Sequence, residues 1–195
     1  MKLRFSGYGR IHVDWLTEEE IERVFQTRMT PQQAVLIGAG LLQGMRRIET
    51  LRMTFRDAQD ALRTQNLRIR GKGGKERTIP LHEQFGEILR GYLAWSEPGE
   101  ETKPLLGIKR TRSEELLEEF CKRFGRRFTF HTMRRSFGRA LWLKKVELET
   151  ISEILGHSST DMTRRYLGLN LSDMRAALQK HQIRVSVASF EHPAP

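Results

Sequence analysis

The chain has 195 residues, of which 38% are hydrophobic and 30% are charged, and its formal net charge is +10 at pH 7. This length accommodates one well-buried domain with at most a small appendage, and the composition excludes a disordered or membrane-embedded chain. A single cysteine, Cys121, excludes an internal disulfide and a metal site of the CxxC type.

The first part of the chain predicts an arm followed by helices. Residues 1–16 show no clear periodicity and are expected to form an arm or linker. Thr17 precedes three glutamates, which is typical of a helix start because the hydroxyl caps free N–H groups and the acids face the positive end of the helix dipole. A threonine–proline pair at 30–31 predicts a second helix start. A further helix is expected over residues 45–53, with Ile48 turned toward the core.

The next segments change to a period of two. Residues 61–63, 67–70 and 77–81 alternate apolar and polar side chains, which is typical of strands. The glycine-rich segment 71–75 lies between the last two and predicts a hairpin turn, since glycine accepts positive φ angles. We therefore expect a small three-stranded antiparallel sheet.

The rest of the chain is predicted to be helical, apart from a proline-containing loop near residues 98–104. The expected helices cover residues 82–96, 112–125, 131–144, 147–155 and 171–183. The fold class is therefore α+β and mainly helical, with one small sheet. Residues 17–183 are expected to form the domain and residues 184–195 a C-terminal tail.

Basic side chains gather in parts of the chain instead of being spread evenly. They cluster at residues 67–77, 109–113 and 122–139. Clustered cations beside turns suit contacts with phosphates, so the charge favours a nucleic-acid partner. Because the sequence shows no signal peptide and no apolar run of the ~18 residues that span a bilayer, we expect a cytoplasmic, nucleoid-associated protein, or a nuclear one if the source has a nucleus.

Several residues are candidates for phosphate chemistry, although each one alone is more often structural. His131 and Arg134 lie three residues apart at the start of a predicted helix, so both side chains can reach one phosphate. His157 follows a leucine–glycine pair at a predicted helix end, and Tyr166 stands nine residues later. Lys72 lies in the glycine-rich turn, from which it can move onto a ligand. Two imidazoles, an arginine and a phenol at these spacings form a group suited to phosphoryl transfer.

Five motifs occur in a fixed order along the chain. They are Gly44-Met45-Arg46 with Glu49, the hairpin segment 71–81, His131-Thr132-Met133-Arg134-Arg135-Ser136-Phe137, Leu155-Gly156-His157-Ser158, and Tyr166. This order resembles the tyrosine recombinases, the phage-integrase type of site-specific DNA recombinases. The resemblance runs from about Leu16 to Leu178. It is specific, because five ordered motifs rarely coincide by chance.

The resemblance implies a catalytic set that cleaves and rejoins DNA through a 3′-phosphotyrosine link. Tyr166 would attack the backbone phosphate, Lys72 would protonate the leaving 5′-oxygen, and His131 would act as general base or phosphate donor. The residues implied to bind the phosphate or to orient those that do are Arg46, Arg134, His157 and, in support, Glu49. Additional DNA contacts are expected from Arg47, Lys75, Arg77 and Arg135. No metal, cofactor or ATP is expected, because the cationic side chains offset the phosphate charge and the phosphotyrosine conserves the bond energy.

The resemblance also implies partners. The expected substrate is double-stranded DNA, and the expected protein is a monomer when free and a tetramer on paired DNA sites, with accessory DNA-bending proteins. The C-terminal helix 171–183 would dock on a neighbouring protomer or on its own domain. Most relatives carry a helical core-binding domain ahead of the catalytic domain, whereas 45 residues precede Arg46 here. We therefore expect the chain to lack a complete clamp around DNA.

Two other functions fit the same residues. A nicking–closing enzyme of the type IB topoisomerase kind uses similar chemistry, although the leucine–glycine–histidine motif favours a recombinase. A catalytically silent DNA-binding or regulatory relic belongs to a different class of function. The complete set of six catalytic candidates argues against this third interpretation.

Overall fold

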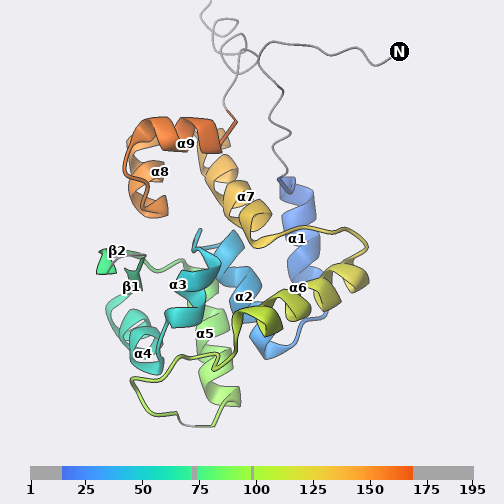
Figure 1. Ribbon diagram of the computed structural model, residues 1–195. Helices are drawn as coiled ribbons and strands as arrows, with labels where there is room; N and C mark the ends of the chain where they lie inside the picture. Colours follow the sequence, from blue (N-terminus) through green and yellow to red (C-terminus); the bar gives the residue numbers. More distant parts are fainter. Residues whose placement is uncertain (1–14, 72–73, 98, 169–195) are drawn as a thin grey trace, which may run out of the picture.

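A computed structural model describes residues 15–71, 74–97 and 99–168. Lys72, the expected helix 171–183 and the expected tail 184–195 lie outside these described residues. The elements of Figure 1 follow one another as α1 (Glu18–Gln26), α2 (Pro31–Leu41), α3 (Arg47–Arg52), α4 (Phe55–Thr64), β1 (Asn66–Arg70), β2 (Glu76–Pro80), α5 (Glu83–Trp95), α6 (Arg110–Phe124), α7 (Phe130–Leu143), α8 (Leu148–Leu155) and α9 (Thr160–Tyr166). The mainly helical α+β class is confirmed.

Threonine caps begin several of these helices. The side chains of Thr17, Thr30 and Thr129 each accept a hydrogen bond from the backbone N–H three residues later, at the starts of α1, α2 and α7. Each side chain at that third position bonds back to the backbone of its cap, which satisfies a second N–H group. The helix starts predicted at Thr17 and at the threonine–proline pair are confirmed.

The sheet is a hairpin of β1 and β2 in the described part of the chain. The strands are antiparallel, with Asn66 opposite Pro80 and Arg70 opposite Glu76, so the predicted pairing of the two strands that flank segment 71–75 is confirmed. Residues 61–63 were expected to be a strand and instead lie in α4. Their alternation is too short to define a period, whereas the buried Ala58 and Ala61 share the face of a helix.

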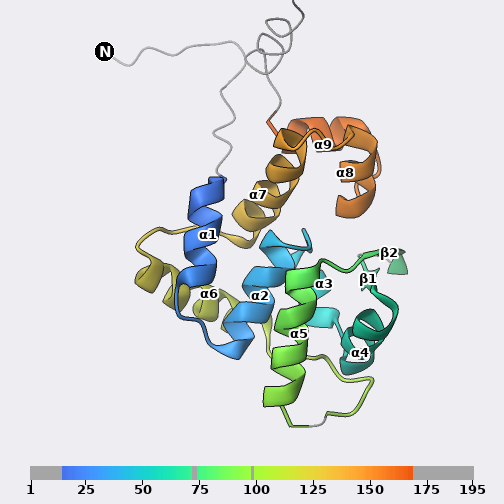
Figure 2. The ribbon, with the colours of Figure 1, turned by 180° about the vertical axis from the view of Figure 1, so that it is seen from behind.

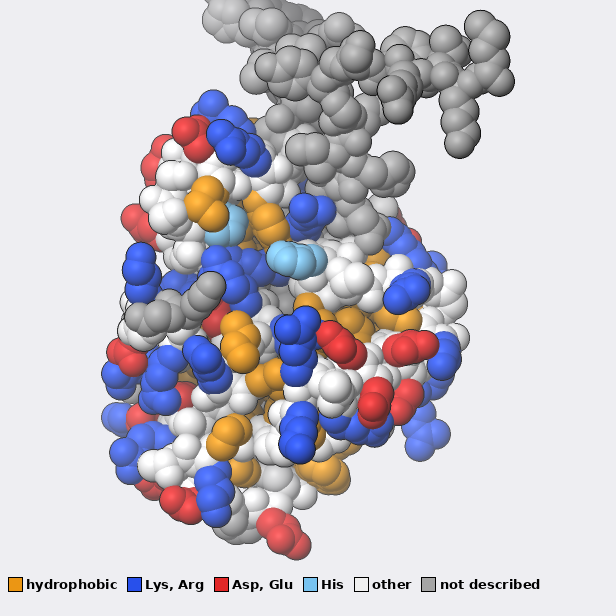
Figure 3. Space-filling view, in the orientation of Figure 1, with side chains coloured by type: hydrophobic (Ala, Val, Ile, Leu, Met, Phe, Trp, Pro, Cys, Tyr) orange, Lys and Arg blue, Asp and Glu red, His pale blue; other side chains and the backbone are white. Residues whose placement is uncertain are grey.

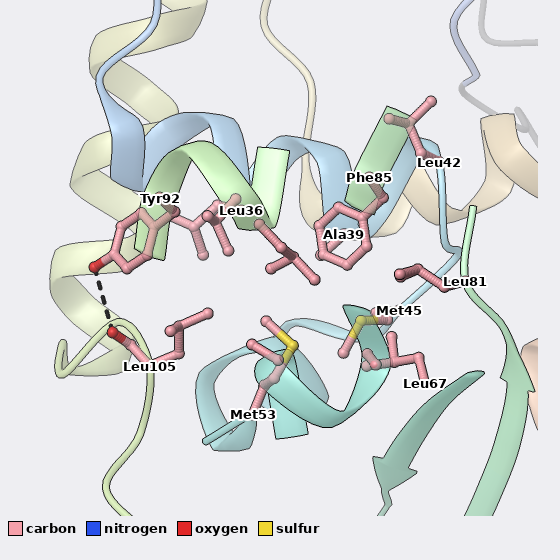
Figure 4. Close-up of a cluster of buried hydrophobic side chains, with 14 of the residues drawn as sticks. Leu36, Ala39, Leu42, Met45, Met53, Leu67, Leu81, Phe85, Tyr92 and Leu105 are labelled. Carbon is pink, nitrogen blue, oxygen red and sulfur yellow. Dashed lines mark hydrogen bonds between the residues drawn. The ribbon is translucent and has the colours of Figure 1, made fainter. Parts of the chain in front are cut away.

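The main core lies around α2, in which residues 34–41 are all apolar. This helix packs against α5, α6 and α7, and α5 runs beside it in Figure 2. Figure 4 shows the cluster in which Leu36, Phe85 and Leu67 come together from α2, α5 and β1. At its edge, the hydroxyl of Tyr92 donates to the carbonyl of Leu105 at 3.3 Å.

Helices α7, α8 and α9 form a second group above the hairpin in Figure 1. Their small core consists of Leu148, Ile151, Leu155 and Leu167. Gly138 allows this packing, because a Cβ there would lie 2.9 Å from Leu167.

Two expectations about the first helices need correction. Ile48 was expected to face the core and is 44% exposed, because α3 is short and its buried side is taken by polar residues such as Glu49. The N-terminal arm was expected to reach residue 16, but Leu16 is buried and its N–H donates to Ser136 Oγ at 2.8 Å. No helix among residues 15–71, 74–97 and 99–168 is long and apolar enough to cross a membrane.

Candidate active site

Arg134 joins three of the sequence motifs. It lies on α7 and is only 3% exposed. One terminal nitrogen of its guanidinium donates to the carbonyl of Gly44, and the other donates to the carbonyl of Leu155. Burial and the charge of Arg46 lower the pKa of Arg134 to about 10, so it stays charged at neutral pH. A guanidinium carries five donors, so Arg134 has N–H groups beyond these two, and it also hydrogen-bonds to Tyr166.

Glu49 organises the other arginines of the site. Its carboxylate accepts hydrogen bonds from both terminal nitrogens of Arg77 and from Arg46, at 2.8 to 3.0 Å. Burial favours a raised pKa for Glu49, but the bonds and charges of Arg77 and Arg46 outweigh it and lower the pKa to about 2. Arg77 Nε donates to the carbonyl of Ile154, and Arg46 donates to that of Gly156. The carboxylate thus ties α3 and β2 to the turn that carries the second histidine.

Tyr166 lies at the end of α9 over this network. Its hydroxyl donates to the backbone carbonyl of His131 at 3.4 Å. Its ring centroid is 5.1 Å from that of His157, 5.3 Å from the guanidinium carbon of Arg135 and 5.9 Å from that of Arg134. The structure therefore brings together the phenol, both imidazoles and a buried arginine that the motif order predicted.

The cationic surroundings shift the titration of these groups. Burial, reinforced by Arg134 and Arg46, lowers the pKa of His157 to about 4. Burial and neighbouring arginines also lower the pKa of His131. Both imidazoles are therefore neutral at pH 7, so each carries one N–H donor and one acceptor nitrogen. Burial raises the pKa of Tyr166, although the nearby arginines oppose it, so its phenol is protonated at neutral pH.

A cavity of about 490 Å³ opens beside His131 and Arg134, and both residues contact Tyr166. Arg46, His131 and Arg134 line its polar side, and Ile48 and Phe130 line its apolar side. In Figure 3, lysine and arginine side chains gather on this face, with histidine side chains among them. The site is therefore a cationic recess that can hold a phosphodiester, and the phenol of Tyr166 packs on two of its lining residues.

The residues expected to contact DNA lie in different settings. Arg47 lines the cavity, forms an ion pair with Glu114 and lies 5.1 Å above the ring of Phe130. Lys75 is exposed at the end of the hairpin turn. Arg77 was expected on the DNA surface, but its guanidinium is engaged within the Glu49 network.

Sequence reasoning missed Thr163, which is fully buried on α9. Its hydroxyl oxygen lies 2.8 Å from Nδ1 of His157. Its position, six residues after His157 and three before Tyr166, was the available signal, but α9 itself was not predicted. Within the described ranges, no group of three histidine, cysteine, aspartate or glutamate side chains is placed to hold a metal ion.

Comparisons with known proteins agree with this geometry. The model of the phage integrase family matches residues 14–173. Tyrosine recombinase XerA of Thermococcus kodakarensis is 29% identical in an alignment that covers 86% of this chain and 62% of the relative. The crystal structure of XerA recombinase matches with a TM-score of 0.71 at 22% identity, covering 88% of this chain and 66% of that one. A post-cleavage complex of the XerH site-specific recombinase with palindromic difH substrate matches with a TM-score of 0.65 at 21% identity, covering 86% of this chain and 53% of that one.

The architecture is that of a tyrosine-recombinase catalytic domain, as the motif order predicted. The chain belongs to the phage integrase family. It spans about three fifths of the length of the XerA relative, 62% by alignment.

Proposed function

We propose that this chain is the catalytic domain of a site-specific DNA recombinase that cleaves and rejoins double-stranded DNA through a 3′-phosphotyrosine intermediate. One observation carries the proposal: the hydroxyl of Tyr166 donates to the backbone carbonyl of His131, which lines a cavity together with Arg46 and Arg134, and His157 lies beside the phenol ring. Residues 17–183 would form this domain, and residues 184–195 a tail.

The cleavage step transfers a phosphoryl group to the tyrosine. The phenolic oxygen of Tyr166 attacks phosphorus, and the bond between phosphorus and the 5′-oxygen breaks. His131 takes the phenolic proton, since its lowered pKa leaves a nitrogen free to accept at neutral pH. Lys72 protonates the departing 5′-oxygen, a role that rests on its place in the family hairpin. Attack by a 5′-hydroxyl on the phosphotyrosine reverses the step and joins the strands, without ATP.

The arginines bind the phosphate oxygens as charge develops on them. Arg134 is held by two backbone carbonyls, so its remaining donors need little reorganisation when the transition state forms. Arg46 is fixed by Glu49, and its side chain is 39% exposed at the cavity. His157 adds a neutral donor. Arg47, Lys75 and Arg135 contact the DNA backbone around the scissile phosphate.

The partners follow from the same proposal. The substrate is double-stranded DNA; the related XerH structure is a complex with a palindromic site, which supports this assignment. We propose a monomer in solution and a tetramer on paired sites, with DNA-bending proteins as accessories. The working location is the cytoplasm, at the nucleoid. The net charge of +10 supports attraction to DNA that weakens steeply with salt.

A trapping experiment tests this function. The chain is incubated with a pool of randomised duplexes that carry nicks, from which the short cleaved fragment diffuses away, and covalent protein–DNA complexes are separated under denaturing conditions. We expect trapping by the wild-type chain, loss of trapping in Tyr166→Phe, and nearly unchanged DNA binding. Tyr92→Phe is the matched control and should trap normally, because Tyr92 lies in the main core.

The outcomes separate the alternative functions. Trapped DNA with a shared sequence supports a recombinase, whereas trapping without sequence preference indicates a nicking–closing enzyme. A relic binds DNA and traps none. Trapping that persists in Tyr166→Phe would contradict the assigned nucleophile.

A further inference from the structure

Thr163 connects the helix that carries the nucleophile to a histidine in the turn before it. The hydroxyl oxygen of Thr163 lies 2.8 Å from Nδ1 of His157. Thr163 is on α9, three residues before Tyr166, and is 0% exposed. The histidine lies beyond the end of α8, where Gly156 terminates that helix in a left-handed conformation. The bond therefore joins the turn 156–159 to α9.

The proton count decides which atom donates in this bond. A threonine hydroxyl has one proton, and when it is buried that proton needs an acceptor. Among the described residues, Nδ1 of His157 is the acceptor that the structure offers it. If Nδ1 carried the hydrogen instead, the buried hydroxyl proton would be left without a partner, at a cost of about 1–3 kcal/mol. The hydroxyl of Thr163 therefore donates, and the neutral ring carries its hydrogen on Nε2.

The surroundings keep the ring neutral. Burial disfavours the charged ring most strongly, the guanidinium groups of Arg134, Arg46 and Arg77 repel a proton on His157, and Glu49 attracts one. A neutral ring with Nδ1 occupied has one donor left, the Nε2–H group. A neutral ring in the other tautomer would present a lone pair from Nε2 to a phosphate oxygen, which repels it.

We propose that Thr163 is a positioning residue that holds His157 in the Nε2–H tautomer, so that the imidazole donates to a phosphate oxygen while α9 is docked. This inference deepens the proposed function and rests on it. Because Thr163 and Tyr166 share α9, the same docking that places the nucleophile also sets the donor. Departure of α9 would release both at once, so the site would be assembled only as a unit.

The tautomer can be measured without any DNA. Long-range ¹H–¹⁵N correlation spectra of the histidine rings, assigned with His157→Asn, report which nitrogen carries the hydrogen. We expect Nε2–H for His157 in the wild-type chain and in Thr163→Ser, which keeps the hydroxyl. Thr163→Val removes the hydroxyl at nearly equal volume and should shift the ring toward a mixture that contains Nδ1–H. Thr160→Val makes the same change one turn earlier in α9 and should leave the ring unchanged.

Covalent trapping supplies the second measurement. Thr163→Val should form the phosphotyrosine complex about tenfold more slowly than the wild-type chain at saturating DNA, and Thr163→Ser should stay within about threefold. An Nδ1–H ring in the wild-type chain overturns the proposal, and this result does not depend on whether Thr163→Val folds. An unchanged tautomer in a folded Thr163→Val overturns it as well.

The two proposals fail in different ways. If no variant traps DNA, including the wild-type chain, but the ring is Nε2–H and changes in Thr163→Val, then the proposed function fails and the tautomer assignment stands. If the wild-type chain traps DNA and Thr163→Val traps it equally fast, the positioning role is wrong and the recombinase assignment stands.

Discussion

Both terminal nitrogens of Arg77 reach the carboxylate of Glu49, at 2.8 and 3.0 Å, although the residues are 28 positions apart. The side chain of Glu49 is fully buried, and its carboxylate also accepts a hydrogen bond from Arg46. Two arginines around one buried acid leave a net positive charge in the site. Glu49 thus fixes the arginines in place without cancelling the charge that a phosphate requires.

The first prediction concerns this carboxylate. Glu49→Gln removes the negative charge and leaves Arg77 without its counter-ion in a buried setting, so the free energy of unfolding should fall by roughly 3–5 kcal/mol. Urea denaturation measures the change. Glu76→Gln is the control, because its pair with Arg68 is exposed and should contribute less than about 1 kcal/mol. Equal losses of unfolding free energy in the two variants would show that the buried Glu49 network stabilises the fold no more than an exposed ion pair does.

The second prediction concerns Gly44, which precedes the first arginine motif. Its φ is +62°, and a Cβ there would lie 2.6 Å from Cε1 of Phe137. Gly107 has a φ of +59° with open space around it. Gly107→Ala should therefore cost roughly 1–2 kcal/mol from backbone strain alone. Gly44→Ala should cost about 1–3 kcal/mol more, because the ring must also shift. Comparison of the two unfolding free energies isolates the packing cost.

The helix starts were predictable because their signals are local. A threonine cap followed by acids or by proline needs no tertiary contact, and the starts of α1 and α2 fall where those signals lie. The same signal stands at α4, where Thr54 caps the helix with Asp57 three residues on, and the strand predicted from the short alternation at 61–63 lies inside this helix. Periodicity read over residues 55–64, and not over three residues alone, favours the helix.

The site was only partly predictable. Motif order identified Tyr166 and both histidines, and the structure places them together. It did not identify the partners of Arg77 or Thr163, since these depend on how β2 and α9 pack against the turn after α8. Spacing along the chain indicates which residues gather, whereas hydrogen-bond partners follow from the three-dimensional packing.

The third prediction is a loss of stability as the pH falls. The pKa of His157 is about 4 in the folded state, below its ordinary value of 6.5, so the unfolded chain binds more protons between these values. The contribution of His157 to the free energy of unfolding is complete above pH 6.5. It is lost as the pH falls toward 4, which lowers the stability by roughly 1–3 kcal/mol. The pKa of Glu49 is about 2 in the folded state, below its ordinary value of 4.5, so its contribution to stability is lost as the pH falls below 4.5. His157→Asn should flatten the upper part of the curve in denaturant titrations. A curve unchanged by this substitution would contradict the buried neutral imidazole.

The fourth prediction is that covalent trapping continues in excess chelator. Arg46 and Arg134 supply the positive charge that metal ions provide in many phosphoryl-transfer enzymes. Trapping rates measured with and without chelator should agree within about twofold. A loss in chelator that magnesium restores would count against the arginine assignment. Higher salt is the contrasting condition, because it should weaken DNA binding in both samples.

The last prediction separates the charge of Arg134 from its geometry. Arg134→Lys keeps the positive charge, but one ammonium group cannot reach both the Gly44 and Leu155 carbonyls and also a phosphate in a fixed direction. Covalent trapping should fall at least about 100-fold, as when a preorganised donor is removed. The free energy of unfolding should fall by about 1–3 kcal/mol, because a buried carbonyl loses its partner.

Arg68→Lys, in an exposed pair with Glu76, is the control and should change neither quantity appreciably. DNA binding should keep its salt dependence in Arg134→Lys, since the number of charges is the same. Trapping at the wild-type rate would show that charge alone suffices at this position and that the two carbonyl bonds serve only the fold.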